Sequence, residues 1–272
     1  MIPNLLSIAG FDSSGGAGIQ ADLKTFSALG GYGMTVLTAL PIQNTMGVTS
    51  CYSIPIAAIT EQLEVIFSDI TPHAIKIGML FNQDIIKVVA NFLEPYAGEI
   101  PIVIDPVMMA KSGDALLLPD AIDCLKKELL PLATIITPNI PEAEVLLGTK
   151  IANAEAMPGA AEKLLALGCK AVLLKGGHLS SSDAADYYLD NKGNSVTLSA
   201  PRTATRNTHG TGCTLSAAIT ACLGHGKTIQ ESCEIAKKYI QQAIIHGKDW
   251  SVGNGAGPVH HFYHLWPCLE KV

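Results

Sequence analysis

The sequence predicts an α/β fold in which a mostly parallel sheet is covered by helices on both faces. Two observations support this. Short runs rich in β-branched residues alternate with helical stretches, and the runs are apolar throughout rather than at every second position. Such strands are buried on both faces, as in parallel sheets between helices. The 272 residues contain no linker, repeat or low-complexity stretch, so we expect a single domain over residues 1–272.

The amino-acid composition argues against nucleic acids and membranes as binding partners. Hydrophobic residues make up 48% of the chain, and 18 Lys and Arg against 24 Asp and Glu give a net charge of −6. An acidic chain is a poor match for nucleic acid or an anionic membrane. The N-terminus lacks the positive region of a secretory signal, and no apolar run is long enough to span a bilayer. The seven cysteines are odd in number and form no C-x-x-C pair, which fits free thiols in a cytoplasmic protein.

The first expected strand, residues 5–9, leads through a glycine-rich loop into a helix at 19–29. Residues 16–21 read Gly-x-Gly-x-x-Ala, a loose form of the dinucleotide fingerprint. The next strand, 33–40, does not end in the acidic residue that would hold a ribose, which argues against a dehydrogenase. It leads into Gln43 and Asn44. Such amides are ordinarily turn formers, but one could read the edge of a heterocycle. Asp22 in the first helix ordinarily indicates a solvated face or a dipole partner, and less often a substrate contact.

The rest of the chain alternates in the same way. Helices are expected at 56–69, 83–93, 120–130, 142–147 and 157–167, and strands at 74–79, 102–105, 134–137 and 171–175. Residues 183–189 and 194–198 flank a turn-forming Asp-Asn-Lys-Gly and predict a hairpin at one edge of the sheet.

Polar residues follow several of these strands. Asp105 ends one strand and precedes the loop 107–113, Asn139 and Glu142 follow the next, and Lys175 ends another. Each alone has an ordinary role as a turn residue or a first-turn acid. Together they gather where α/β sheets bind ligands, at the carboxyl edge. Asp105, Asn139 and Glu142 offer oxygens suited to Mg²⁺, and Lys175 could meet phosphate oxygens.

Residues 208–213 read Thr-His-Gly-Thr-Gly-Cys and run into an expected helix at 214–223. Glycines let backbone N–H groups converge, and a helix start adds unpaired donors and partial positive charge. The stretch therefore predicts a phosphate site. Cys213 lies in this field, so we expect its pKa to fall below the free value of about 8.5 and the thiol to accept a proton. The ordinary alternative is a loop capping a buried helix, with Cys213, Met79 and Val107 as core residues.

Taken together, these motifs resemble the ribokinase-like superfamily, and closely its hydroxymethylpyrimidine/phosphomethylpyrimidine kinases. Six segments carry the resemblance: residues 9–22, 43–45, 105–108, 139–142, 175–178 and 209–213. It implies a three-layer α/β/α sandwich, usually a homodimer, with ATP as donor and Mg²⁺ as cofactor. The implied acceptor is 4-amino-5-hydroxymethyl-2-methylpyrimidine, phosphorylated to its monophosphate and then its diphosphate in thiamin biosynthesis.

The resemblance also implies roles for individual residues. Gln43 would read the pyrimidine edge, and the other substrate contacts would be Gly10, Ala17, Asp22, Met79 and Val107. Asn139, Lys175 and Thr208 would contact the nucleotide, and Asp105 and Glu142 the metal. The anion hole would comprise Gly210, Thr211, Gly212 and Cys213, with Cys213 also as the base.

Two other interpretations remain open beside the remote dehydrogenase. Many sugar kinases of the superfamily carry Asp at the position of Cys213, whereas some pyridoxal kinases share the cysteine. Pyridoxal or pyridoxine kinase activity is therefore the alternative within the class. A non-catalytic ligand-binding module on the same fold is the alternative outside it. The intact set of polar residues argues against that module: Asp105, Asn139, Glu142, Lys175 and Cys213.

Overall fold

The computed structural model describes residues 1–109, 117, 120–179 and 183–266. Its main sheet has the strand order β10-β9-β8-β7-β6-β5-β1-β2. The parallel strands are β1 (Asn4–Ala9), β2 (Tyr32–Leu37), β5 (Ala74–Ile77), β6 (Ile102–Ile104), β7 (Ile135–Ile136) and β8 (Ala171–Lys175). The hairpin of β9 (Asp183–Asp190) and β10 (Ser195–Pro201) forms one edge, with β9 antiparallel to β8, which confirms the expected edge hairpin.

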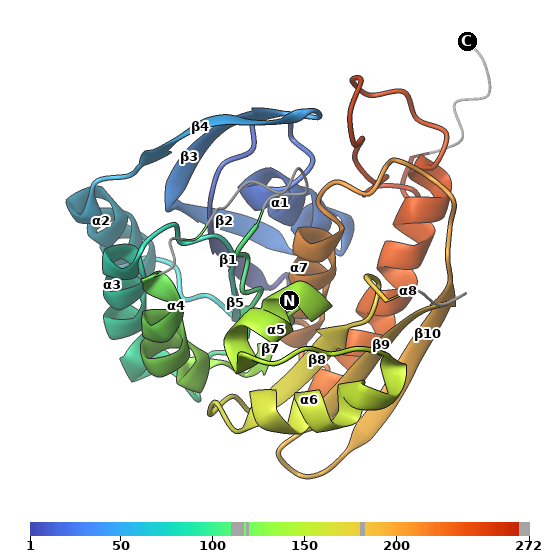
Figure 1. Cartoon of the computed structure of the whole chain (residues 1–272). Helices are drawn as coiled ribbons and strands as arrows, with labels where there is room; N and C mark the ends of the chain where they lie inside the picture. The colour runs from blue at the N-terminus through green and yellow to red at the C-terminus, as the bar shows by residue number, and fades with distance from the viewer. Residues whose placement is uncertain (110–116, 118–119, 180–182, 267–272) are drawn as a thin grey trace.

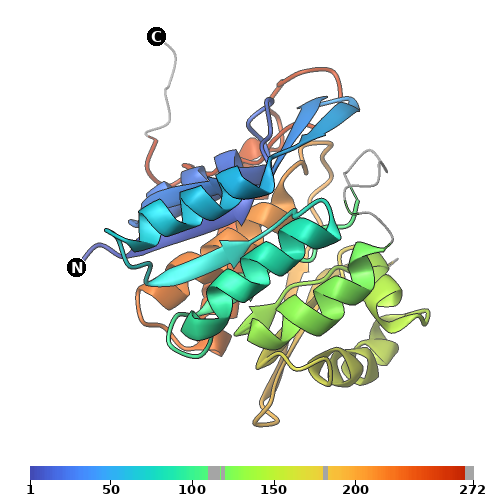
Figure 2. The ribbon, with the colours of Figure 1, turned by 90° about the vertical axis from the view of Figure 1, so that its left-hand side faces the viewer.

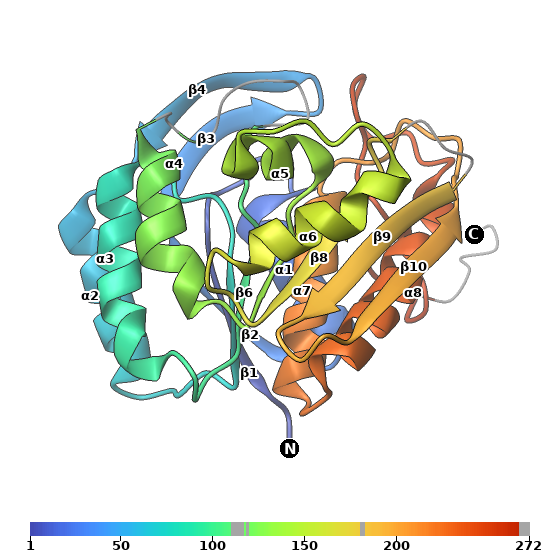
Figure 3. The same ribbon diagram turned by 60° about the horizontal axis from the view of Figure 1, so that its bottom comes forward.

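Helices cover both faces of this sheet (Figures 1 and 3). One layer contains α1 (Gly18–Ala28), α7 (Thr211–Gly224) and α8 (Ile229–Gly247). The other contains α2 (Ile56–Phe67), α3 (Gln83–Leu93), α4 (Ala121–Cys124), α5 (Ile140–Leu147) and α6 (Met157–Leu165). After α4 the chain continues as a π-helical turn, Leu125–Leu129, and a 3-10 turn, Leu130–Leu132. Shorter 3-10 turns lie at Glu94–Tyr96 and Ala154–Ala156. The predicted three-layer α/β/α sandwich is thus confirmed.

The central strands are apolar at most positions because their two faces pack into different cores. In β1, Leu5 joins the cluster under α7 and α8, whereas Leu6 joins the cluster under α2 and α3. In β6, Val103 faces the first of these clusters and Ile104 the second. Burial on both faces is the condition under which the period-2 polar pattern disappears.

The expected continuous strand at 33–40 is wrong. The chain leaves the main sheet at Thr38, whose N–H donates to the Ala9 carbonyl and whose hydroxyl donates to the Met79 carbonyl. It then forms β3 (Ala39–Asn44), which pairs with β4 (Gly47–Ser53) in a separate two-stranded sheet beyond the end of the main sheet (Figure 1). Gln43 is therefore a strand residue rather than a turn former.

The helices and cysteines of the described residues can be compared with what the sequence predicts. None of the described helices is both long and apolar enough to cross a membrane. The six cysteines within the described residues are all free thiols, as expected. Most of the loop expected at 107–113 lies outside the described residues.

Candidate active site

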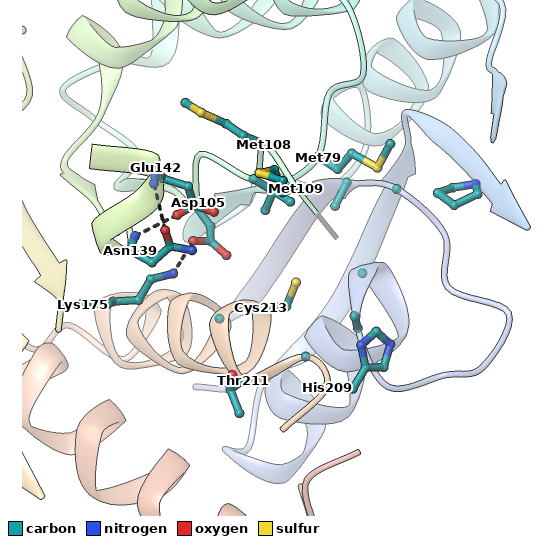
Figure 4. A pocket seen from close by; sticks show the side chains of 18 of the residues that line it. Met79, Asp105, Met108, Met109, Asn139, Glu142, Lys175, His209, Thr211 and Cys213 are labelled. Atoms are coloured by element: carbon teal, nitrogen blue, oxygen red, sulfur yellow. Dashed lines mark hydrogen bonds and ion pairs between the residues drawn. The ribbon is translucent and has the colours of Figure 1, made fainter. Parts of the chain in front are cut away.

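A cavity of about 420 Å³ opens where the carboxyl ends of the central strands meet the start of α7 (Figure 4). Every site residue expected from the sequence except Asp22 lies on its wall: Gly10, Ala17, Gln43, Met79, Asp105, Val107, Asn139, Glu142, Lys175, Thr208, Gly210, Thr211, Gly212 and Cys213. The topology accounts for this, because β1, β5, β6 and β8 are parallel and end at one edge. Segments far apart in the sequence thus form one site.

The start of α7 is built to leave backbone donors open. Gly210 is its N-cap at φ +77°, a left-handed conformation that favours glycine. A Cβ at this position would lie 1.7 Å from the Gly16 carbonyl oxygen, so the two glycine loops pack backbone to backbone. No side chain among the described residues caps this helix start. Among the first N–H groups of α7, which have no intrahelical acceptor, that of Thr211 makes a long 3.4 Å hydrogen bond to the Thr208 carbonyl. The N–H groups that follow it, of Gly212 and Cys213, are left to face the cavity.

The first glycine loop is closed, in contrast, by a residue that the sequence analysis did not single out. The buried Asp12 carboxylate accepts hydrogen bonds from the N–H groups of Ser14, Gly16 and Ala17. It also lies 2.8 Å from Nε2 of His209. Burial acts to raise the pKa of Asp12, but the hydrogen bonds from His209 and Ser14 outweigh it and lower that pKa. Because the amides of this loop are already occupied, the Gly-x-Gly-x-x-Ala segment does not present a pyrophosphate site.

An ion pair lies opposite the open helix start. The Lys175 ammonium donates to Asp105 Oδ1 at 2.8 Å (Figure 4). The Thr137 hydroxyl donates to the same oxygen at 3.1 Å. Burial disfavours the charged lysine, yet Asp105 and Glu142 hold the pKa of Lys175 above its ordinary value. A Cβ on Gly212 would lie 3.3 Å from the ammonium and 3.4 Å from Asp105 Oδ2. The backbone donors, the cation and the carboxylate thus converge on one region.

Asn139 and Glu142 form a reciprocal capping box at the start of α5. The Glu142 N–H donates to Asn139 Oδ1 at 2.9 Å, and the Asn139 N–H donates to Glu142 Oε2 at 2.8 Å. The structural role of a first-turn acid is therefore present, while both side chains also face the cavity (Figure 4). Burial raises the pKa of Glu142 to about 7; Lys175 opposes this shift and Asp105 adds to it.

The carboxylates of the cavity suit a magnesium ion that is also bound by water and substrate phosphates. No cluster of three or more His, Cys, Asp or Glu suited to a metal occurs within the described ranges. Asp105 and Glu142 are two carboxylates on one wall of the cavity. Mg²⁺ commonly binds through one or two carboxylates together with water and substrate phosphates. The residues present fit that mode rather than a protein cage.

The expectation of a low thiol pKa at Cys213 is wrong. Its sulfur faces the cavity from the first turn of α7 (Figure 4). Burial raises the pKa of the Cys213 thiol to about 11, against the opposing charge of Lys76. The field of the helix start alone would lower the pKa of this thiol, but desolvation of the thiolate outweighs that field. The free protein therefore carries a neutral thiol near pH 7.

Asp22 is neither on a solvated face nor on the cavity wall. It is fully buried, where it pairs with Lys76 at 2.9 Å and accepts a 2.6 Å hydrogen bond from the Ser7 hydroxyl. The cavity wall at this point is formed by Lys76. Burial acts to lower the pKa of Lys76, but the charge of Asp22 raises it, so we assign a charged lysine. Asp22 thus influences the site through Lys76.

The other end of the cavity is largely apolar. Met79 and Val107 flank it, and the Gln43 amide projects from β3, 3.5 Å from the Phe11 carbonyl. A Cβ on Gly10 would meet the Met79 sulfur at 3.0 Å, so Gly10 leaves room for that side chain. Several other residues of the cavity wall had no role predicted from the sequence: Phe11, Pro41, Lys76, Met108, Met109, His178 and His209. An apolar slot with one amide suits a flat polar heterocycle.

The fold, the open helix start and the facing carboxylates define a kinase of the ribokinase-like class. Comparison with known proteins agrees with this. The family model described as phosphomethylpyrimidine kinase matches residues 12–260. The chain therefore belongs to the phosphomethylpyrimidine kinase family.

Three relatives illustrate the match. A hydroxymethylpyrimidine/phosphomethylpyrimidine kinase of Rhizobium meliloti is 49% identical, over 96% of this chain and 97% of its own. A thiamine biosynthesis bifunctional protein of Geobacter sulfurreducens is 46% identical, over 95% of this chain and 52% of its own. The solved structure of the Staphylococcus aureus pyridoxal kinase with AMP-PCP and pyridoxal has a TM-score of 0.87 and 36% identity, over 97% and 96% of the two chains.

Proposed function

We propose that this chain transfers the γ-phosphoryl group of ATP to the hydroxyl of 4-amino-5-hydroxymethyl-2-methylpyrimidine and then to the resulting monophosphate, in thiamin biosynthesis. One observation carries the proposal. The uncapped start of α7 faces the Asp105–Lys175 pair in the same cavity that holds the Gln43 amide. Anion-binding donors and a heterocycle-binding slot are thus in reach of one small substrate. The named relatives support the same chemistry.

In the proposed mechanism, backbone donors of Gly210, Thr211 and Gly212 hold the transferring phosphoryl group, while Lys175 and Thr208 contact the nucleotide. Phosphoryl transfer depends mainly on alignment and on stabilising charge, which these groups supply. Magnesium, held through Asp105 and Glu142, would neutralise phosphate charge when bound. Asn139 keeps Glu142 in place through the capping box.

The two transfers differ in their need for a base. In the first, the acceptor hydroxyl gives its proton to the thiolate form of Cys213, which is the minor form at neutral pH because burial raises the pKa of the thiol to about 11. The acceptor oxygen forms a bond to the γ-phosphorus, and the bond to the β–γ bridging oxygen breaks to release ADP. In the second, the acceptor is an ionised phosphate that has no proton to lose at neutral pH. The second transfer therefore relies on the anion hole and on charge neutralisation.

The acceptor end of the cavity supports binding of the pyrimidine ring. Gln43 offers a donor and an acceptor to the ring edge, with Met79, Val107 and Ala17 against its faces. Asp22 acts from beneath this wall, through Lys76. A pyridoxal or pyridoxine acceptor is the second candidate, because the fold of the S. aureus pyridoxal kinase matches this chain closely.

The test is incubation with ATP and Mg²⁺ and, separately, hydroxymethylpyrimidine, its monophosphate or pyridoxal, with products identified by mass. We expect successive gain of two phosphoryl groups by the pyrimidine and slower or no phosphorylation of pyridoxal. Efficient phosphorylation of pyridoxal with none of the pyrimidine would overturn the acceptor assignment. Omission of Mg²⁺ should abolish both transfers.

We also propose that the chain is one ribokinase-like domain that acts as a cytoplasmic homodimer. Large apolar side chains are exposed on the β3–β4 sheet and its turn: Ile42, Met46 and Tyr52. An exposed patch of this kind on a small sheet suits a protein interface. Light scattering after gel filtration should report twice the 28.6 kDa chain mass, and a charged residue at Tyr52 should shift the mass toward that of the monomer. Free thiols and ATP use agree with a cytoplasmic location.

A further inference from the structure

The segment after α8 passes beside the tip of the β3–β4 hairpin, near the top of the molecule in Figures 1 and 2. We call residues 253–258, Gly-Asn-Gly-Ala-Gly-Pro, the glycine strap. On one side it contacts the hairpin turn. The Ala256 N–H donates to the Thr45 carbonyl at 2.8 Å, and the Gly255 N–H lies 3.2 Å from the Thr45 hydroxyl. Thr45 is only two residues beyond Gln43.

The other side of the strap contacts the chain that leads into the anion hole. The His209 N–H donates to the Gly257 carbonyl at 3.0 Å, and His209 forms a β-bridge with Pro258. Asn207, two residues before His209, is buried. Its side-chain amide donates to the carbonyls of Gly247 and Trp250 at 2.8 Å. The start of the strap and the start of the anion hole are thus held together.

The glycines of the strap are required by close packing. A Cβ on Gly255 would lie 1.9 Å from the Thr45 carbonyl oxygen, and one on Gly257 would lie 2.1 Å from Asn207 Oδ1. A Cβ on Gly253 would lie 2.3 Å from the Thr45 hydroxyl oxygen, and Gly253 also has φ +67°. Contacts this short occur only where a side chain is missing, so the strap fits tightly between hairpin and anion hole.

The hairpin needs such outside support. A two-stranded sheet is marginally stable by itself, and β4 contains no buried residue. Beyond β3–β4 pairing, Gln43 exchanges hydrogen bonds with the Ser13 hydroxyl, Phe11 contacts Ala39 and Gln43, and Thr45 contacts the strap. Phe11 and Ser13 flank Asp12, and Asp12 contacts His209. These supports of the hairpin therefore lead back to the anion-hole loop.

We propose that the glycine strap is a positioning element that sets the distance between Gln43 on the hairpin and the anion hole at Gly210. The inference rests on the proposed function, since Gln43 then holds the acceptor ring while the anion hole holds the phosphoryl group. A misplacement of about 1 Å between reacting groups can cost roughly 10²-fold in rate. Residues 253–258 are not part of the cavity wall, so the strap acts through Gln43.

The test compares two alanine variants: the added Cβ of Gly255→Ala contacts the Thr45 backbone, and that of Gly253→Ala contacts the Thr45 side chain. Gly255→Ala presses on the Thr45 backbone, so we expect kcat/KM for the hydroxymethylpyrimidine to fall about 10²-fold and its Kd, measured by calorimetry, to rise. The Kd of a non-hydrolysable ATP analogue should stay near the wild-type value. Gly253→Ala presses on the Thr45 side chain, so Thr45→Ala in the same chain should restore most of the loss, whereas it should not rescue Gly255→Ala.

The controls carry the same substitution without the contact. Gly159 in α6 has no atom within 4 Å of an added Cβ, and Gly226 shares the positive φ of Gly253 with equally open space. Alanine at either should leave acceptor binding unchanged. Equal weakening of the acceptor and the ATP analogue in Gly255→Ala, or no rescue of Gly253→Ala, would overturn the inference. Failure of the wild-type protein to bind the pyrimidine would instead overturn the proposed function.

Discussion

Alanine at Gly210 is the sharpest perturbation of the anion hole. Gly210 has φ +77°, and its added Cβ would lie 1.7 Å from the Gly16 carbonyl oxygen. Real Cβ contacts essentially never fall below 3.0 Å, so the two glycine loops must separate by more than 1 Å. The first N–H groups of α7 move with that separation, because Gly210 is the N-cap of the helix.

The magnitude follows from what those donors do. Loss of a single preorganised donor typically costs about 10²–10³ in kcat, and a 1 Å misplacement about 10². We therefore expect kcat/KM of Gly210→Ala to fall about 10²–10³-fold in both phosphoryl transfers, because both use the same anion hole. A coupled ADP-release assay, run once with the hydroxymethylpyrimidine and once with its monophosphate, measures the two transfers.

Gly226→Ala is the matched control. Gly226 has nearly the same backbone angle, φ +79°, but no atom within 4 Å of an added Cβ. Both variants should lose about 1–2 kcal/mol of stability from left-handed strain, whereas only Gly210→Ala should lose activity. Wild-type kcat/KM in Gly210→Ala, or equal losses of activity in the two variants, would refute the assignment of the anion hole.

Three further predictions concern single groups in the cavity. Gln43→Ala should raise the KM for the pyrimidine about tenfold, equivalent to one hydrogen bond of about 1.4 kcal/mol, and leave the KM for ATP nearly unchanged; a parallel rise in both would contradict a ring-reading role. Burial raises the pKa of Glu142 to about 7, so this carboxylate becomes protonated as the pH falls below 7. Below pH 7 the Mg²⁺ concentration needed for half-maximal rate should therefore rise. Glu142→Gln should abolish that pH dependence, and an unchanged pH profile would exclude Glu142 as a ligand. Because the pKa of the Cys213 thiol is about 11, the fraction of thiolate grows as the pH rises. The rate of the first transfer should therefore increase from pH 7 to 10, whereas the rate of the second should not. A first transfer insensitive to pH in that range would argue against a thiolate base.

Local patterns in the sequence predicted most of the sheet and the polar residues at its carboxyl edge. Asp105 and Lys175 are 70 residues apart, yet they meet because β6 and β8 are parallel and neighbour β7. Parallel topology brings strand ends together without any further information. The open start of α7 at the cavity was likewise predictable, because glycines before a helix leave backbone donors unpaired there.

What the sequence could not predict depended on partners far along the chain. The β3–β4 hairpin was missed because its apolar run continues that of β2, and only the contacts of Thr38 with Ala9 and Met79 separate them. No local pattern indicates the role of Lys76, since its partner Asp22 lies 54 residues away. The raised pKa of the Cys213 thiol reflects burial by the folded chain, which no local motif encodes.

The account depends most on the thiol beside the anion hole, and Cys213→Ala tests it directly when the two transfers are measured separately. The first transfer should fall about 10²–10⁴-fold, the usual contribution of a positioned base. The second transfer, from ATP to an acceptor that is already ionised, should change little. Equal losses in both transfers would contradict the role assigned to Cys213.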